Sequence, residues 1–141
     1  MKFKYNDGGR AAAGYKGDTR DCVTRSIAIA SGKSYTEVYE ALQRIMKTDK
    51  RHSGNTSPRN GVLRKHYEKY LRSIGFEFVA CMGIGSGCRV HVREDELPSG
   101  SIILRLSRHL CCVVDGVIND TFDCSRGGNR CVYGYYRLKN K

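Results

Sequence analysis

The sequence lacks any long apolar run. The longest is a stretch of a few residues such as Ser101–Leu106, far short of the roughly 20 apolar residues that cross a bilayer as a helix. Residues 1–20 are polar and glycine-rich and lack the apolar centre of a signal peptide. We therefore expect no membrane segment and a cytoplasmic protein, from a bacterium or a phage-infected host.

Acidic residues are also scarce. The chain has 14 Asp and Glu against 25 Lys and Arg, which gives a net charge of +11. Much of the excess lies in the segment Arg44–Arg72, where only Asp49 and Glu68 are acidic. Such a field favours an anionic partner, either a nucleic acid or an acidic protein. A solvated surface that keeps the protein soluble explains it equally well, and no known nucleic-acid-binding motif is present.

Patterns for nucleotides and metals are missing. The glycines of Gly83–Gly87 are followed by neither the lysine nor the helix of a phosphate-binding loop. Paired CxxC motifs are absent as well. Cys88 and His91 have acceptable spacing for two zinc ligands, which Cys124 and Cys131 would complete, but these last two are far apart across a glycine loop. We expect neither a metal nor a cofactor.

Seven cysteines are present, an odd number that argues against a closed disulfide framework. Cys111 and Cys112 are adjacent in a strand-like run, so their side chains point to opposite faces. In a reducing compartment the thiols stay free. We expect most of them to be small buried apolar residues.

The 141 residues are enough for one domain. Apolar spacing predicts a helix from Cys22 to about Ser31, a second over Tyr35–Lys47 and a third carrying Leu63 to Ile74, with a polar and flexible loop over residues 50–61. Strands are expected after the helices, at Phe76–Met82, Arg89–Val92, Ser101–Leu106, His109–Val114, Val117–Thr121 and Cys131–Leu138. This order indicates an α+β domain with N-terminal helices followed by an antiparallel sheet.

The two residues Asp115-Gly116 separate two apolar runs, which is a strong signal for a hairpin with a type I′ turn. With a two-residue loop, Cys111 lies opposite Asp120, and His109 is on the same face as Cys111. His109 and Asp120 are then diagonal neighbours. A carboxylate beside a histidine fixes the orientation of the ring and stabilises its charged form.

A cysteine is predicted at the start of the first helix. Asp21 precedes Cys22 and is a suitable N-cap residue. The unpaired N–H groups and the dipole of a helix N-terminus lower the pKa of a thiol located there. The backbone N–H of Cys22 can also donate to an oxyanion. These features predict a nucleophile.

Together, residues 21–25, 108–116 and 119–121 resemble papain-like cysteine peptidases, in which a cysteine opens an N-terminal helix and a histidine and an Asp or Asn follow on later strands. The compact bacterial branches, such as bacteriocin-leader peptidases, are similar in size. The resemblance implies a papain-like fold and a thiol hydrolase that cleaves a peptide, isopeptide or amide bond. It assigns Cys22 as nucleophile, His109 as base and Asp120 as the residue that orients the histidine.

One part of the family pattern is missing. Papain-like enzymes have a Gln shortly before the cysteine as an oxyanion donor, whereas the sole Gln of this chain is Gln43. Lys16, Thr19 or a backbone N–H of residues 14–21 are the candidates to replace it. Cys88 is the alternative nucleophile. The same scaffold also supports acyl transfer, deamidation and non-catalytic binding, so the alternative function is a basic protein that binds nucleic acid or an acidic partner.

Overall fold

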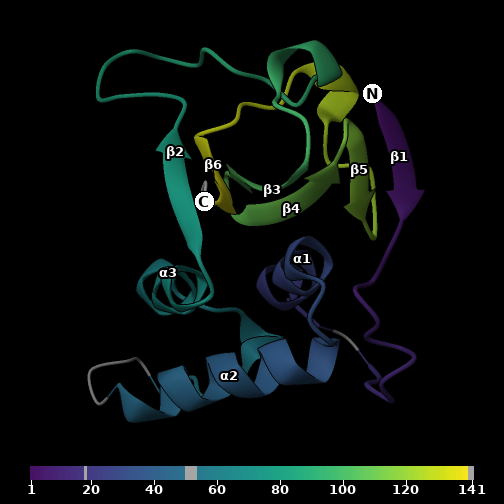
Figure 1. Ribbon diagram of the computed structural model, residues 1–141, viewed down its shortest axis with the longest axis vertical. Coiled ribbons are helices and arrows are strands. Elements are labelled where there is room, and N and C mark those ends of the chain that lie inside the picture. Colours follow the sequence, from purple (N-terminus) through teal and green to yellow (C-terminus); the bar gives the residue numbers. More distant parts are fainter. Residues whose placement is uncertain (18, 50–53, 140–141) are drawn as a thin grey trace.

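The computed structural model describes residues 1–17, 19–49 and 54–139. Three α-helices lie on one side of the sheet: α1 (Cys22–Ser31), α2 (Tyr35–Thr48) and α3 (Arg64–Ser73). Figure 1 shows α1 beneath the sheet and α2 crossing below the other two helices. The described residues therefore confirm an α+β fold, with helix bounds that match the predictions to within one or two residues at each end.

Six strands form one sheet in the order β1-β5-β4-β3-β6-β2. Their bounds are Lys2–Tyr5 for β1, Phe76–Ala80 for β2, Ser101–Leu106 for β3, His109–Val114 for β4, Val117–Asp120 for β5 and Gly134–Leu138 for β6. All neighbours are antiparallel except β1, which pairs with β5 in parallel. The prediction of a purely antiparallel sheet is therefore wrong at this edge.

Strand β1 was not predicted: it has only four residues, Lys-Phe-Lys-Tyr, and all four side chains are exposed. Backbone pairing with β5 holds the strand, and it continues to Asn6, whose N–H donates to the carbonyl of Asp120 at 2.9 Å. A strand that buries no side chain has no apolar face to reveal it in the sequence.

The predicted strand Arg89–Val92 is also wrong. It makes a single isolated bridge, between His91 and Cys131. Two backbone hydrogen bonds, from the N–H of Val92 to the carbonyl of Arg130 and from the N–H of Val132 to the carbonyl of Val90, join these segments together with a disulfide between Cys88 and Cys131. The last strand accordingly begins at Gly134 and not at Cys131.

Apolar side chains form a core on each face of the sheet. One core lies between the helices and the sheet and includes Ile27, Leu42 and Leu110. The other covers the opposite face and includes Cys111, Val113 and Ile118. Successive residues of β4 thus serve alternate cores, as the strand geometry requires. No helix among the described residues is long and apolar enough to cross a membrane.

Candidate active site

The three predicted catalytic residues lie at the ends of three elements. Cys22 is the first residue of α1, His109 the first of β4 and Asp120 the last of β5. The helix packs directly on β3 and β4, which brings residues 22 and 109 together although 86 positions separate them in the sequence. Packing between helix and sheet therefore assembles the site.

The β4–β5 hairpin has the predicted register. Val114 pairs with Val117 and Cys112 with Asn119. Both turn residues have positive φ, 46° at Asp115 and 80° at Gly116, which a type I′ turn requires. A turn with one more or one fewer residue would have brought Asn119, not Asp120, to the histidine.

The Nε2 atom of the half-buried His109 lies 2.6 Å from Oδ2 of the buried Asp120, in a hydrogen bond. Burial alone would lower the pKa of His109, but hydrogen bonds with Asp120, Cys124 and Cys22 outweigh it and raise the pKa to about 11. Burial likewise opposes the charge of Asp120, yet the bond to His109 holds the pKa of this carboxyl below its usual value. Both groups are charged at neutral pH.

Cys22 lies on the other side of this pair. Burial disfavours its thiolate, but a hydrogen bond with His109 and the charge of the imidazolium lower its pKa. The backbone N–H of Leu110 and the charge of Arg25 add to this effect. A raised pKa on the imidazole and a lowered pKa on the thiol favour a thiolate–imidazolium pair, which is the reactive state of a cysteine nucleophile.

A groove of about 470 Å³ exposes this pair to solvent. Cys22 and His109 both line it and are partly exposed. The segment 61–64 and Tyr67 form one wall, and residues 105–110, which connect β3 to β4, form another. A substrate carbonyl can thus reach the sulfur from outside.

Arg25 is a site residue that the sequence analysis missed. Its Nε and Nη2 atoms donate to Asp120 Oδ1 at 3.0 and 2.8 Å, and the backbone N–H of Thr121 donates to the same oxygen at 2.7 Å. Asp120 therefore uses one oxygen for Arg25 and the other for His109. The signal in the sequence was the position of Arg25, one helical turn after Cys22 and on the same face.

Asp21 occupies the predicted N-cap position but makes no side-chain cap. Its carboxylate instead pairs with Arg25 and accepts a hydrogen bond from the hydroxyl of Tyr35 at 2.7 Å. The cap prediction is therefore wrong for the side chain, because a buried arginine competes for the same oxygens.

Neither side-chain candidate for the oxyanion donor reaches the groove. Thr19 donates its hydroxyl to the carbonyl of Arg59 at 3.4 Å, and Lys16 is exposed and absent from the groove lining. Arg20 lines the groove in their place. The third candidate, a backbone N–H of residues 14–21, stays a prediction.

Cys88, the alternative nucleophile, is in the disulfide with Cys131 and has no free thiol. This bond overturns the expectation that all seven thiols are reduced, since disulfides are rare in reducing compartments. It also removes two of the four zinc ligands considered above. His91 Nδ1 lies 3.2 Å from Glu96 Oε1 instead.

Cys124 was not expected near the site. Its sulfur and the ligand atoms of His109 and Asp120 all lie within 4.8 Å of one another. Hydrogen bonding with Cys111 is the main cause that lowers the pKa of Cys124 to about 6, and His109 contributes. These three residues could together hold a metal ion, but Arg25 already neutralises Asp120 and its charge opposes a second cation. Cys124 is buried and does not line the groove.

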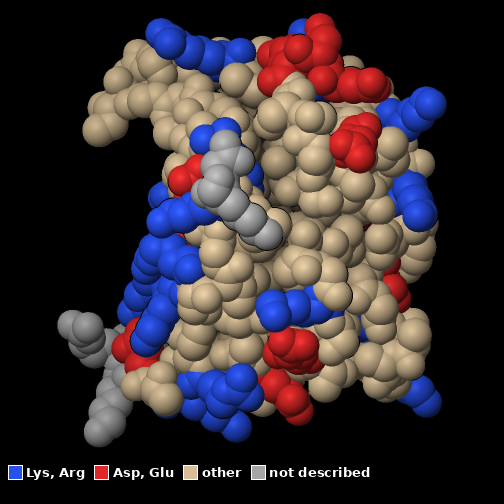
Figure 2. All heavy atoms as spheres, in the orientation of Figure 1, with Lys and Arg blue, Asp and Glu red and all other residues tan. Residues whose placement is uncertain are grey.

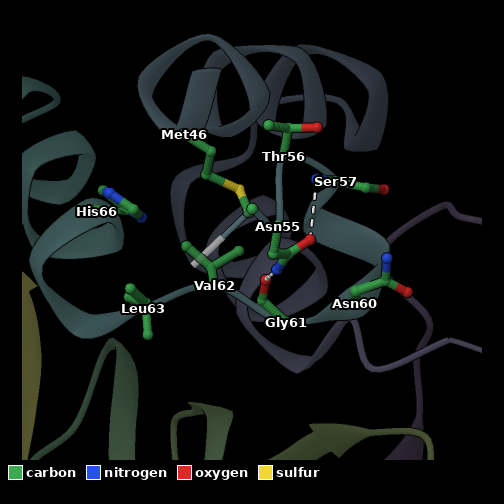
Figure 3. Close-up of a pocket in the computed structure, with 10 residues that line it drawn as sticks. Met46, Asn55, Thr56, Ser57, Asn60, Gly61, Val62, Leu63 and His66 are labelled. Carbon is green, nitrogen blue, oxygen red and sulfur yellow. Dashed lines mark hydrogen bonds between the residues drawn. The ribbon is translucent and has the colours of Figure 1, made fainter. Parts of the chain in front are cut away.

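A second pocket, of about 570 Å³, lies apart from Cys22 (Figure 3). Residues 61–63 line both this pocket and the groove and so separate them. His66 is the titratable residue in its described lining. The Nε2 atom of His66 lies 2.8 Å from Asp49 Oδ2, and its Nδ1 has no hydrogen-bond partner in the described part of the chain. No cysteine or carboxylate lines this pocket within the described residues, so acyl chemistry is favoured in the groove.

Part of the predicted flexible loop, residues 50–53, lies outside the described residues. The remainder is held by hydrogen bonds, such as Asn55 Nδ2 to the carbonyl of Gly61 at 2.9 Å, and contains a short 3-10 helix at Pro58–Asn60. Gly61, at the end of this part, is the first residue of the segment 61–63 that lines both the pocket and the groove.

Comparison with protein-family models, with curated proteins and with solved structures found no match. The function is therefore inferred from the geometry of the site.

Proposed function

We propose that this protein is a thiol hydrolase of papain-like design that cleaves a peptide, isopeptide or amide bond through Cys22, His109 and Asp120. One observation carries the proposal. His109 Nε2 bonds to Asp120 Oδ2, His109 and Cys22 line the same groove, and His109 lowers the pKa of the Cys22 thiol against the opposing effect of burial. A histidine that only filled the core would need neither a thiol partner nor access to solvent.

The reaction has two halves. The Cys22 thiolate attacks the carbonyl carbon, a C–S bond forms, and His109 gives its proton to the departing amine as the C–N bond breaks. Water then attacks the acyl-enzyme, and His109 takes a proton from it. The C–S bond breaks and a carboxylic acid leaves. Asp120 keeps the ring oriented and stabilises its charged form throughout.

Alkylation with iodoacetamide at pH 6 tests the nucleophile. We expect peptide mapping to find carbamidomethylation at Cys22 well before Cys81, which is also partly exposed but has a pKa raised by burial. Equal rates at the two thiols would count against the assignment. Cys81→Ala serves as the matched control, because it removes a partly exposed thiol outside the groove.

Turnover tests the chemistry. A library of tetrapeptides that release a fluorescent amine should be cleaved by the wild type and by Cys81→Ala, and not by Cys22→Ala. The Cys22→Ala variant should keep the circular dichroism spectrum of the wild type. Cleavage that persists in folded Cys22→Ala would refute a covalent mechanism at this residue.

A second candidate is a non-catalytic basic protein that binds nucleic acid or an acidic protein. It is favoured by the Lys and Arg side chains that gather over α3, whereas Asp and Glu gather at the end of the molecule away from the helices (Figure 2). Lys65 and Arg64 already pair with Asp49 and Glu68, which reduces the free charge of α3. Binding of an oligonucleotide that falls steeply with salt and is unchanged in Cys22→Ala would favour this candidate.

A further inference from the structure

The groove beside Cys22 is lined by positive charge. Its described lining contains four arginines and neither Asp nor Glu. The arginines are Arg20, Arg64, Arg105 and Arg108. With low-dielectric walls, a cleft that carries one sign of charge concentrates ligands of the opposite sign.

The arginines come from separate segments and converge on the catalytic pair. Arg20 lies two residues before Cys22, and Arg108 immediately precedes His109. Arg105 is on β3 and pairs with Leu110 of β4. Positive charge is thus placed on both sides of the position where a substrate carbonyl would be attacked.

Most of this charge is uncompensated. Arg64 donates to Glu68 at 3.0 Å, but in the described part of the chain Arg20, Arg105 and Arg108 have no carboxylate partner. Arg105 instead lies over the ring of Tyr133, with its guanidinium carbon 5.6 Å from the ring centroid. This stacking holds the planar guanidinium at the groove and leaves its N–H groups for a ligand.

Some arginines elsewhere are paired: Arg25 contacts two carboxylates, Arg93 pairs with Glu96 and Arg137 with Glu77. Others in the described part of the chain, such as Arg44, Arg72 and Arg89, make no ion pair either. The groove differs from these single surface sites because four arginines line one cavity and no Asp or Glu is in its described lining.

We infer that the substrate is an acidic peptide segment, with Asp or Glu side chains on both sides of the bond that is cleaved. This inference rests on the proposed function, because it places the carboxylates relative to the Cys22 sulfur. Guanidinium groups bind carboxylates through two parallel hydrogen bonds, and apolar lining such as Val23 and Leu106 suits the stems of those side chains. The attack needs an acyl carbon, which peptides have and the backbone of a nucleic acid lacks.

The test compares fluorogenic tetrapeptides that differ only by Asp for Asn or Glu for Gln at each position. We expect kcat/KM to be about tenfold or more higher for the acidic member at one or more positions, because a hydrogen bond between charged groups replaces a neutral one. Arg105→Gln and Arg108→Gln should abolish this preference. Arg72→Gln, the same change on exposed α3 outside the groove, should keep the preference.

A second measurement does not depend on turnover. The rate of Cys22 alkylation by anionic iodoacetate, relative to neutral iodoacetamide, should fall in Arg105→Gln and Arg108→Gln and stay constant in Arg72→Gln. A ratio that does not change in the groove variants overturns the inference, even where no tetrapeptide is cleaved.

The outcomes distinguish a failure of the proposed function from a failure of the inference about acidic substrates. If Cys22 is inert, the proposed function fails and the inference fails with it. If peptides are cleaved without preference for carboxylates, or the preference survives in the groove variants, the inference alone is wrong. Protection of Cys22 from iodoacetamide by an oligonucleotide, but not by a penta-glutamate peptide of equal charge, would also overturn it.

Discussion

Arg25 binds one oxygen of Asp120 through two of its nitrogens and leaves the other oxygen to the histidine. Asp120 is consequently held between two cations. A rotation of the carboxylate would break contacts on both sides at once, so the arginine fixes the orientation of the aspartate as the aspartate fixes the orientation of the imidazole. Arg25 acts through its neighbours and is a positioning residue.

Replacement of Arg25 by Gln should be strongly destabilising. The variant removes the cation that the buried Asp21 and Asp120 share, so that Asp21 keeps only Arg10 at 3.9 Å and Asp120 keeps only His109. Loss of one partner of a buried pair costs about 3–5 kcal/mol. Urea unfolding at pH 7 measures the cost. Arg137→Gln, which removes an exposed pair with Glu77, is the control and should change the unfolding free energy much less, because solvent screens an exposed pair.

The more conservative Arg25→Lys separates positioning from charge. Lysine keeps the cation, but its single nitrogen cannot replace the three nitrogens with which Arg25 binds Asp120 and Asp21. We expect a folded protein in which iodoacetamide reacts with Cys22 more slowly at pH 6, since Asp120 holds His109 less firmly. A variant that folds and reacts at the wild-type rate over the whole pH range would show that the arginine only stabilises the fold.

Asp120→Asn should shift the pH dependence of Cys22. Without the carboxylate, the pKa of His109 falls from about 11 and the thiol loses part of the imidazolium that lowers its own pKa. The alkylation rate at pH 6 should drop by about tenfold or more, with the midpoint of the profile moving to higher pH. Asp123→Asn, at an exposed carboxylate bonded to Ser125, should leave the profile unchanged.

Asp120→Asn should also change how the free energy of unfolding depends on pH. The folded pKa of Asp120 is depressed below its usual value of 3.8, so its ionised form stabilises the fold above about pH 4, and this contribution is lost as the pH falls through the folded pKa. The difference in unfolding free energy between wild type and Asp120→Asn should therefore be large at pH 6 and shrink toward pH 2. A difference that is constant over this range would mean that the carboxylate is not charged in the fold.

Local signals predicted the parts of the site that depend on neighbouring residues. Asp115-Gly116 fixed the hairpin, and hence the meeting of His109 and Asp120, because a type I′ turn has a defined register. The start of α1 at Cys22 followed from its apolar spacing and from the polar residue before it. Both are features of a few consecutive residues.

The missed parts depend on contacts between remote segments. Cys124 approaches His109 only after the chain folds back behind the sheet, and the Cys88–Cys131 disulfide closes a separation of 43 residues. Asp21 correctly indicated where the first helix begins. Its carboxylate pairs with Arg25 instead of capping the helix, because a buried guanidinium requires a counterion. One sequence without an observed geometry cannot rank such competing partners.

The alkylation rate of Cys124 tests whether the burial of a thiol or its ionisation controls its reactivity. The pKa of this thiol is lowered to about 6, so it is largely ionised at pH 7.5, yet its exposed fraction is 1%. We expect iodoacetamide to leave Cys124 unmodified in the folded protein and to modify it rapidly in urea. Modification of Cys124 ahead of Cys22 in the folded state would make it the accessible thiol and overturn the assignment of the nucleophile.

The disulfide should stabilise the fold without taking part in the site. Reduction, or the pair of substitutions Cys88→Ser and Cys131→Ser, releases a loop that the bond closes between residues 43 apart, and chain entropy gives a cost of up to about 4 kcal/mol for a loop of this size. We expect thermal unfolding at a lower temperature in the presence of a phosphine reductant. The serine variant is its own control, because the reductant should not change its melting temperature.

In both the reduced protein and the serine variant, Cys22 should still be alkylated at the wild-type rate, since neither Cys88 nor Cys131 lines the groove. A reductant that shifts the serine variant by the same amount as the wild type would show that the stabilising bond lies elsewhere.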